Sequence, residues 1–247
     1  MGKTFYPLTN PQKSIWVTEQ YFSNTSINNL CGYLLLNMPV DVNILKKSAQ
    51  KLIELNDSLR LRFVLDKNNV PLQYVSDFKL EDIPHLELSS EKELKSAQEV
   101  IASRPFNVID SSLISFTSFK LSNNNGGLIL NMHHLISDAW SFSLIINQFL
   151  DIYKSFCTNT IPSCNYNSYL DYINSEQIYM NSNKFINDEA YWNSIFNTVP
   201  QLATFPSPKR MNIDTNSTIS KRKTLIRFCP HTAVRMLRNT RKSLFPI

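Results

Sequence analysis

Two adjacent histidines followed by an acid could carry acid–base chemistry in this chain of 247 residues. His133 and His134 follow an apolar run, and Asp138 comes four residues after the second histidine. A neutral imidazole near pH 7 can accept a proton from an attacking amine or hydroxyl group. Asp138 could organise the site by capping a helix or by pairing with a buried arginine. On spacing alone, two histidines merely hydrogen-bonded by neighbours at a strand end explain the pattern at least as well.

The elements around the pair would hold it rigidly. Apolar residues over 128–132 predict a strand that runs directly into the histidines, and the apolar spacing over 138–156 predicts a long helix after them. Side chains alternate across a strand, so one imidazole would point into a cleft and its neighbour into the protein.

Similar patterns predict the other elements of the chain. We expect helices over 10–22, 41–55, 91–103, most of 166–195 and the start of another over 231–238, and strands over 30–36, 59–65, 71–75, 113–121 and 224–228. Turn residues over 66–69 and 123–127 would join strands into hairpins. Strands mixed with helices on this scale predict an α/β fold, specifically an α+β two-layer sandwich.

The cysteines and histidines do not form a metal-binding pattern. Cys31 lies in an apolar strand-like run and Cys157 follows an apolar helix, and the four cysteines include no CxxC pair. We therefore expect buried thiols that behave as small apolar side chains. His133 and His134 are adjacent, and no cysteine or histidine lies at ligand spacing from them, so no metal site is expected.

The charge distribution and the apolar runs argue against nucleic-acid and membrane partners. Ten of the 25 Lys and Arg residues follow residue 206, but they are spread through strand- and helix-like segments, which favours a solvated face over a nucleic-acid surface. No apolar run approaches the roughly 20 residues that a membrane-spanning helix needs. The first residues lack the apolar core of a secretory signal, so we expect an intracellular, cytoplasmic protein.

The string from His133 to Ser141 closely resembles the HHxxxDG signature of nonribosomal peptide synthetase condensation domains, which is usually followed by Trp-Ser. Further segments match the family's other motifs in the same order. They are Leu8 to Trp16, which resembles the opening motif; Asn56 to Phe63, which is similar to HExLRTxF; Pro105-Phe106-Asn107 with Leu113, before the catalytic hairpin; and Tyr169 to Tyr172 with Tyr191-Trp192, after it. Ordered matches from residue 8 to residue 192 do not arise by chance.

This resemblance implies a chloramphenicol-acetyltransferase-like fold, in which two lobes face each other and substrates enter a tunnel from opposite ends. It implies that His134 acts on the α-amine of the acceptor as that amine attacks a thioester. It also implies that His133 is structural and that Asp138 forms a salt bridge with Arg60, from the second motif.

The resemblance further implies an amide-forming acyltransferase without an intrinsic cofactor. Ala139, Trp140 and Ser141 would lie along the substrate channel. The substrates would be phosphopantetheine thioesters on peptidyl or acyl carrier domains, with acyl-CoA as the other possible donor. Carrier domains, the rest of the condensation domain and an adjacent adenylation domain are the implied partners.

Two departures from the family pattern bear on activity. Ala139 replaces the motif glycine, which is thought to leave room for substrate, and an added methyl group would narrow that passage. The chain is also about half as long as a condensation domain. We expect residues 1–195 to form the N-terminal lobe, 196–216 a linker and 217–247 the incomplete start of a truncated second lobe, so that the chain alone could be inactive.

Three functions remain open from the sequence. The first is amide-bond formation, and the motifs near the N-terminus resemble starter-type domains, which acylate the first amino acid of a lipopeptide. The second is a noncatalytic lobe that docks a carrier protein or a partner subunit. The third is a related acyltransferase that esterifies a hydroxyl acceptor. A half domain would expose apolar surface around Trp140, and association would follow.

Overall fold

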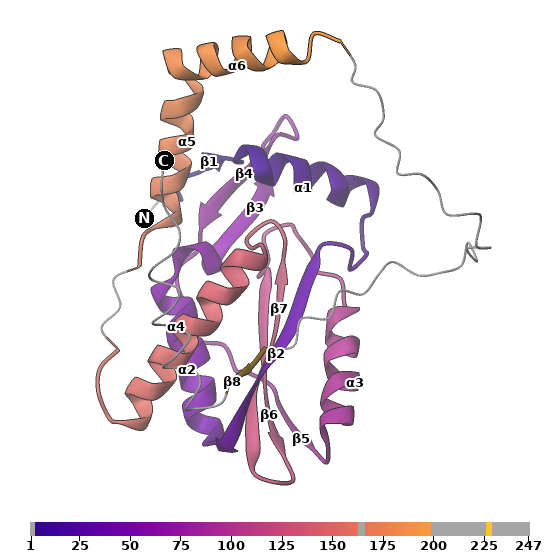
Figure 1. Cartoon of the computed structure of the whole chain (residues 1–247), viewed down its shortest axis with the longest axis vertical. Helices are drawn as coiled ribbons and strands as arrows, with labels where there is room; N and C mark the ends of the chain where they lie inside the picture. Colours follow the sequence, from indigo (N-terminus) through magenta and orange to yellow (C-terminus); the bar gives the residue numbers. More distant parts are fainter. Residues whose placement is uncertain (1–2, 163–165, 199–225, 229–247) are drawn as a thin grey trace, which may run out of the picture. The chain divides into compact units, whose positions relative to one another are not determined.

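The computed structural model describes residues 3–162, 166–198 and 226–228 of the chain (Figure 1). These residues fall into two compact units. Residues 3–162, 166–169 and 226–228 form the first unit, and residues 170–198 form the second. The first unit contains all the residues that the sequence singles out for chemistry.

A five-stranded sheet is the frame of the first unit. Its strand order is β5-β6-β7-β2-β8. The strands are β2 (Asn29–Pro39), β5 (His85–Leu88), β6 (Ile114–Leu121), β7 (Asn125–His133) and β8 (Ile226–Phe228). The central strands β6, β7 and β2 pair antiparallel, whereas β5 runs parallel to β6 and β8 runs parallel to β2.

Helices cover both faces of this sheet (Figure 1). Helices α2 (Val42–Leu55) and α4 (Ala139–Cys157) pack on one face, and α3 (Glu91–Ala102) packs on the other. Strand side chains alternate accordingly: Leu34 and Leu36 belong to the α2–α4 core, while Leu35 between them belongs to the α3 core. The mixed α/β class is confirmed, with α3 as a helical layer additional to the predicted two-layer sandwich.

A smaller, three-stranded sheet lies beside the first helix. It has the order β1-β4-β3, with β1 (Tyr6–Pro7), β3 (Leu61–Leu65) and β4 (Pro71–Val75). Helix α1 (Asn10–Tyr21) packs on this sheet, and the 3₁₀ turn η1 (Asp57–Arg60) leads into β3. A capping box starts α1, since Gln12 accepts a hydrogen bond from the backbone N–H of Thr9 at 2.9 Å. The predicted hairpin of β3 and β4 is confirmed.

The second unit consists of two helices in the residues that the structure describes. They are α5 (Tyr169–Met180), which begins at the last residue of the first unit, and α6 (Asn183–Ile195). The hydroxyl of Ser182 caps α6 by accepting from the backbone N–H of Phe185 at 3.2 Å. The helical prediction for 166–195 is thus confirmed from residue 169 onward.

Two glycines act differently from the sequence prediction. The turn before β7 is predicted over residues 123–127, but Gly126 and Gly127 lie inside the strand and neither has a positive φ. Asn124 takes the left-handed conformation instead, at φ 66°. A Cβ on Gly127 would lie 1.9 Å from the carbonyl oxygen of Leu34, so glycine is needed there for close strand pairing.

Several predictions lie outside the described residues. Of the linker predicted at 196–216, the structure describes residues 196–198, and the helix start predicted at 231–238 falls beyond them. The strand predicted at 224–228 is described over 226–228, where β8 pairs with Leu34–Leu36 of β2. The division of the chain at 195 and 217 stays a prediction.

Candidate active site

The two histidines stand where β7 ends and the connection to α4 begins. We call residues 133–138 the histidine loop. The hydroxyl of Ser137 and the backbone N–H of Ile136 both donate to the carbonyl oxygen of His133, at 3.0 and 3.1 Å. The backbone N–H of His134 donates to the carbonyl oxygen of Asn28, at 2.8 Å. The loop is therefore tied to itself and to the residue that precedes β2.

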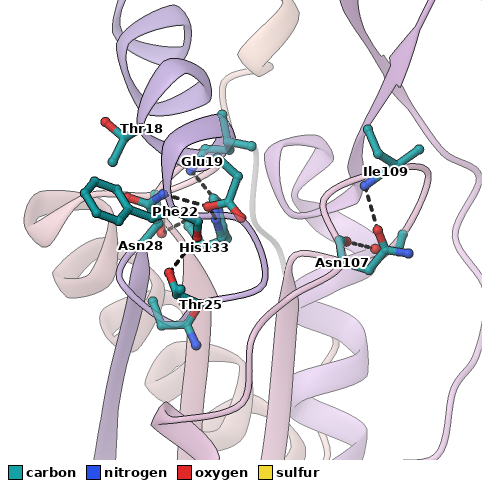
Figure 2. A network of polar contacts seen from close by, with 12 residues as sticks. Thr18, Glu19, Phe22, Thr25, Asn28, Asn107, Ile109 and His133 are labelled. Atoms are coloured by element: carbon teal, nitrogen blue, oxygen red, sulfur yellow. Dashed lines mark hydrogen bonds and ion pairs between the residues drawn. The ribbon is translucent and has the colours of Figure 1, made fainter.

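His133 is the inward histidine. Its side chain is buried, and its Nδ1 accepts a hydrogen bond from the backbone N–H of Leu135 at 3.1 Å. Because an amide N–H only donates, Nδ1 carries no proton, and Nε2 must donate its hydrogen to Oε2 of Glu19 at 3.1 Å (Figure 2). Burial lowers the pKa of His133, although its hydrogen bond to Glu19 acts in the opposite direction. His133 is a neutral, fixed part of the loop.

His134 has the opposite arrangement of hydrogen bonds. It is partly buried, and its Nδ1 lies 3.1 Å from the carbonyl oxygen of Ser137. Because a carbonyl only accepts, Nδ1 carries the hydrogen of the neutral ring and Nε2 keeps its lone pair. No hydrogen bond to this Nε2 is found among the described residues. Geometrically, His134 is prepared to take a proton from an incoming group at Nε2.

Asp138 is the N-cap of α4. Its Oδ1 accepts from the backbone N–H and the hydroxyl of Ser141, both at 2.7 Å. The backbone hydrogen bond from Ser141 is the largest cause that lowers the pKa of the Asp138 carboxyl, and burial opposes it. The side chain is exposed to solvent. Of the two roles that the sequence left open for Asp138, the structure shows the helix cap.

The salt bridge predicted between Asp138 and Arg60 is wrong in this structure. Arg60 donates from Nη1 to the carbonyl oxygen of Ile53 at 3.0 Å and from Nε to that of Ser76 at 3.1 Å, with a further contact to the carbonyl of Glu54. Ion pairs within 4.0 Å in the described residues do not include Arg60 and Asp138. Arg60 instead satisfies carbonyls in the last turn of α2, where helix carbonyls lack partners and a cation is favoured.

One face of α1 holds the histidine loop, a function that the sequence did not predict for this helix. Gln12, Trp16 and Glu19 are the buried residues of α1. Gln12 Nε2 donates to the carbonyl oxygen of Leu135 at 3.1 Å, and Glu19 accepts from His133. The spacing i, i+4, i+7 places all three on one stripe. The sequence signal for this contact was the presence of two polar residues, Gln12 and Glu19, on the same helix stripe as the apolar Trp16.

A family model described as "Condensation domain" matches residues 2–243 of the chain. The chain belongs to the condensation domain family. Its curated relatives include surfactin synthase subunit 1 of Bacillus subtilis (strain 168), 34% identical over 214 residues, and one of the plipastatin synthase subunits of the same strain, 30% identical over 187 residues. These matches cover 83% and 76% of this chain but 6% and 7% of the two relatives.

Solved condensation domains have the same fold. The starter condensation domain of the rhizomide synthetase RzmA has a TM-score of 0.71 at 22% identity, and the first condensation domain of the CDA synthetase has 0.70 at 19%. The alignments cover 78% and 80% of this chain, and 48% and 52% of the solved chains. The chain thus spans about half of those structures. The predicted chloramphenicol-acetyltransferase-like lobe of a condensation domain is confirmed as the fold.

The three residues assigned to the substrate channel form the first turn of α4, which begins at the position of the motif glycine. Ala139 is exposed and has no positive φ, so the backbone does not require the glycine of the family pattern here. Trp140 is 69% exposed, and the hydroxyl of Ser141 is bound to Asp138. Exposed apolar surface at Trp140 is therefore confirmed. That these residues line the channel of a condensation domain stays a prediction.

The described part of the condensation lobe lacks metal-ligand clusters and membrane-spanning helices. It contains no group of three or more His, Cys, Asp or Glu residues that could hold a metal ion, and no described helix is long and apolar enough to cross a bilayer. Burial raises the pKa of the Cys31 thiol to about 11, as expected of a packed cysteine. The expectation of burial is wrong for Cys157, which is exposed at the end of α4.

Proposed function

We propose that this chain is the first lobe of a condensation domain that forms an amide bond. An acyl group would pass from a thioester donor to the α-amine of an amino acid held on a carrier protein through phosphopantetheine. The observation that carries this proposal is the 3.1 Å hydrogen bond between Nδ1 of His134 and the carbonyl oxygen of Ser137, which leaves the lone pair of the neutral ring on Nε2. Membership of the condensation domain family supports the same reaction.

His134 would act on the attacking amine. The amine nitrogen forms a bond to the thioester carbonyl carbon, and the carbon–sulfur bond breaks. The nitrogen loses a proton to Nε2 of His134, and the departing thiolate takes up that proton. The hydrogen bond from Nδ1 to Ser137 would stabilise the imidazolium between these two steps, because a charged donor strengthens the bond. General-base help of this kind typically contributes about 10²–10⁴-fold in rate.

A fatty acyl donor is the specific form that we propose, so the reaction would be the N-acylation of a lipopeptide's first residue. The support comes from the starter condensation domain of the rhizomide synthetase, which has the same fold and one of whose variants has been solved in complex with C8-CoA. The partners would be a carrier domain, the second lobe of the condensation domain and an adjacent adenylation domain. We propose that residues 196–216 lead into this second lobe and that 217–247 are its start.

Product formation from octanoyl-CoA and leucyl N-acetylcysteamine thioester tests the proposal. The 247-residue chain and its His134→Ala variant are each incubated with both compounds, and N-octanoyl-leucyl product is measured by mass spectrometry. We expect product with the wild-type chain and a loss of at least about 100-fold in the variant. Equal product with and without the imidazole would overturn the catalytic assignment of His134.

A noncatalytic docking lobe is the second candidate function. It is favoured by the exposure of Trp140, a large apolar side chain at the start of α4. Absence of product, together with binding of a carrier domain in a titration, would support it over catalysis. The same assay with a hydroxyl acceptor in place of the amine distinguishes the third possibility, because an ester-forming enzyme would acylate that acceptor.

A further inference from the structure

A buried acid contacts the first histidine of the histidine loop. Glu19 of α1 is 4% exposed. Its Oε2 accepts two hydrogen bonds, from Nδ2 of Asn28 at 2.7 Å and from Nε2 of His133 at 3.1 Å (Figure 2). A buried carboxyl group is expensive unless it is hydrogen-bonded, so its position at the back of the motif calls for a role.

A series of hydrogen bonds connects Glu19 to His134. Glu19 holds the hydrogen on Nε2 of His133, which leaves Nδ1 to accept from the backbone N–H of Leu135 at 3.1 Å. The carbonyl of His133 receives the hydroxyl of Ser137 at 3.0 Å. The carbonyl of Ser137 in turn receives Nδ1–H of His134 at 3.1 Å. The backbone N–H of Leu135 can only donate and the carbonyl of Ser137 can only accept, so these two groups define the roles of the imidazole nitrogens that they contact.

We propose that Glu19 is a positioning residue for His134. It selects the Nε2–H tautomer of His133, and through the histidine loop it places the Ser137 carbonyl that selects the Nδ1–H tautomer of His134. The proposal rests on the proposed function, in which Nε2 of His134 takes the proton. Glu19 does not touch the substrate in this scheme.

The alternative tautomer of His133 shows why the acid matters. With its hydrogen on Nδ1, the ring would point a donor at the backbone N–H of Leu135, and neither hydrogen would have an acceptor. An unsatisfied buried donor would then displace Leu135. Gln12 holds the carbonyl of the same residue from the same face of α1, so α1 fixes both polar groups of one peptide position.

Adjacent histidines with opposite tautomers are the measurable consequence. His133 should carry its hydrogen on Nε2, and His134 should carry its hydrogen on Nδ1. Imidazole ¹⁵N shifts distinguish the two forms, because the protonated and the bare nitrogen resonate far apart. The spectrum of the full chain, labelled with ¹⁵N-histidine, contains four such rings, which are assigned by substituting each histidine in turn.

Two substitutions of Glu19 then separate the effect of its hydrogen-bond acceptor from the effect of its side-chain volume. Glu19→Leu removes the acceptor at similar volume, and we expect the single-tautomer pattern to be lost at both His133 and His134. Glu19→Gln keeps a carbonyl oxygen that can accept from both Asn28 and His133, and we expect both patterns to be retained. The signals of His85, whose ring contacts Ser118 and Glu87, should stay unchanged and serve as the control for folding.

Three results would overturn the proposal. The first is the same tautomer at His133 and His134 in the wild-type chain, and the second is an unchanged ¹⁵N pattern of His134 in folded Glu19→Leu. The third is loss of the single-tautomer pattern at both histidines in folded Glu19→Gln. If Glu19→Leu does not fold, the wild-type spectrum and Glu19→Gln decide. The readout needs no substrate, so a failed acyl transfer assay would refute the proposed function without altering the tautomer result, and the reverse also holds.

Discussion

Removing the carboxyl of Asp138 distinguishes a helix cap from a buried ion pair, because the two differ in how much their loss lowers the free energy of unfolding. Asp138→Ala deletes two hydrogen bonds of 2.7 Å, to the backbone N–H and the hydroxyl of Ser141. The carboxyl is exposed, so water can replace it on both donors and no buried group is left unpaired. Loss of an N-cap typically costs about 1 kcal/mol, within roughly 0.5–2 kcal/mol. Breaking a buried ion pair would cost about 3–5 kcal/mol.

Urea unfolding followed by circular dichroism measures this difference. We expect Asp138→Ala to lower the free energy of unfolding by about 1 kcal/mol with an unchanged denaturant slope, and Asp138→Asn to lower it by much less, since asparagine caps equally well. Asp41 offers a matched control, because it caps α2 with bonds to the backbone N–H groups of Asn43 and Ile44 at 2.8 and 3.3 Å. Asp41→Ala should have a similar effect.

A double-mutant cycle with Arg60→Ala completes the test. Because Arg60 binds carbonyls of α2 and Ser76, its loss and the loss of Asp138 should add within roughly 0.3–0.5 kcal/mol. A cost of about 3 kcal/mol or more for Asp138→Ala, together with a coupling energy well above that range, would refute the assignment of Asp138 as a cap and restore the ion pair.

Three further predictions concern packing, pH and association. Gly127→Ala should destabilise the lobe by roughly 1–3 kcal/mol or more, since its Cβ would meet the backbone at Leu34. Gly32→Ala should be milder, because its Cβ meets a movable phenyl ring at 2.8 Å, and urea unfolding compares the two variants. Burial lowers the folded-state pKa of His133, so the unfolded chain binds more protons than the folded chain below about pH 6.5. The free energy of unfolding should therefore decrease as the pH is lowered from about 6.5, and replacing His133 with asparagine should remove this decrease. Exposed apolar side chains such as Trp140 should cause concentration-dependent association in sedimentation velocity.

Each of these has a contradicting result. Equal stabilities of the two glycine variants would mean that β7 can shift away from β2 at Gly127. An identical pH profile in His133→Asn would show that another group titrates in that window. A monomer that persists at high concentration would mean that the exposed apolar residues do not self-associate.

The sequence predicted what depends on local pattern. The spacing of apolar residues is sufficient for α2 and α4, whose inward stripes pack on the five-stranded sheet. Turn residues and alternation are sufficient for the hairpin of β3 and β4. In contrast, β1 spans two residues and β5 spans four, too few for a periodic signal, and both were missed.

The partners of the site residues could not be predicted in the same way. Glu19 contacts a residue 114 positions away, and Gln12 contacts one 123 positions away, so tertiary packing alone determines those pairs. The spacing of apolar residues placed His134 and Asp138 correctly at the strand end and the helix start. The motif resemblance assigned Arg60 to Asp138, which is the wrong partner. A salt bridge inferred for a family does not show which nearby carbonyls compete for the guanidinium.

The short pairing of β8 with β2 has a consequence for where this protein can be shortened. Residues 226–228 pair with Leu34, Leu35 and Leu36 along the outer edge of β2, and these three are the most buried residues of that strand. A version ending before residue 226 would leave an apolar edge strand with free N–H and C=O groups, a known template for strand-to-strand aggregation. Expression boundaries for the isolated lobe should therefore lie beyond Phe228.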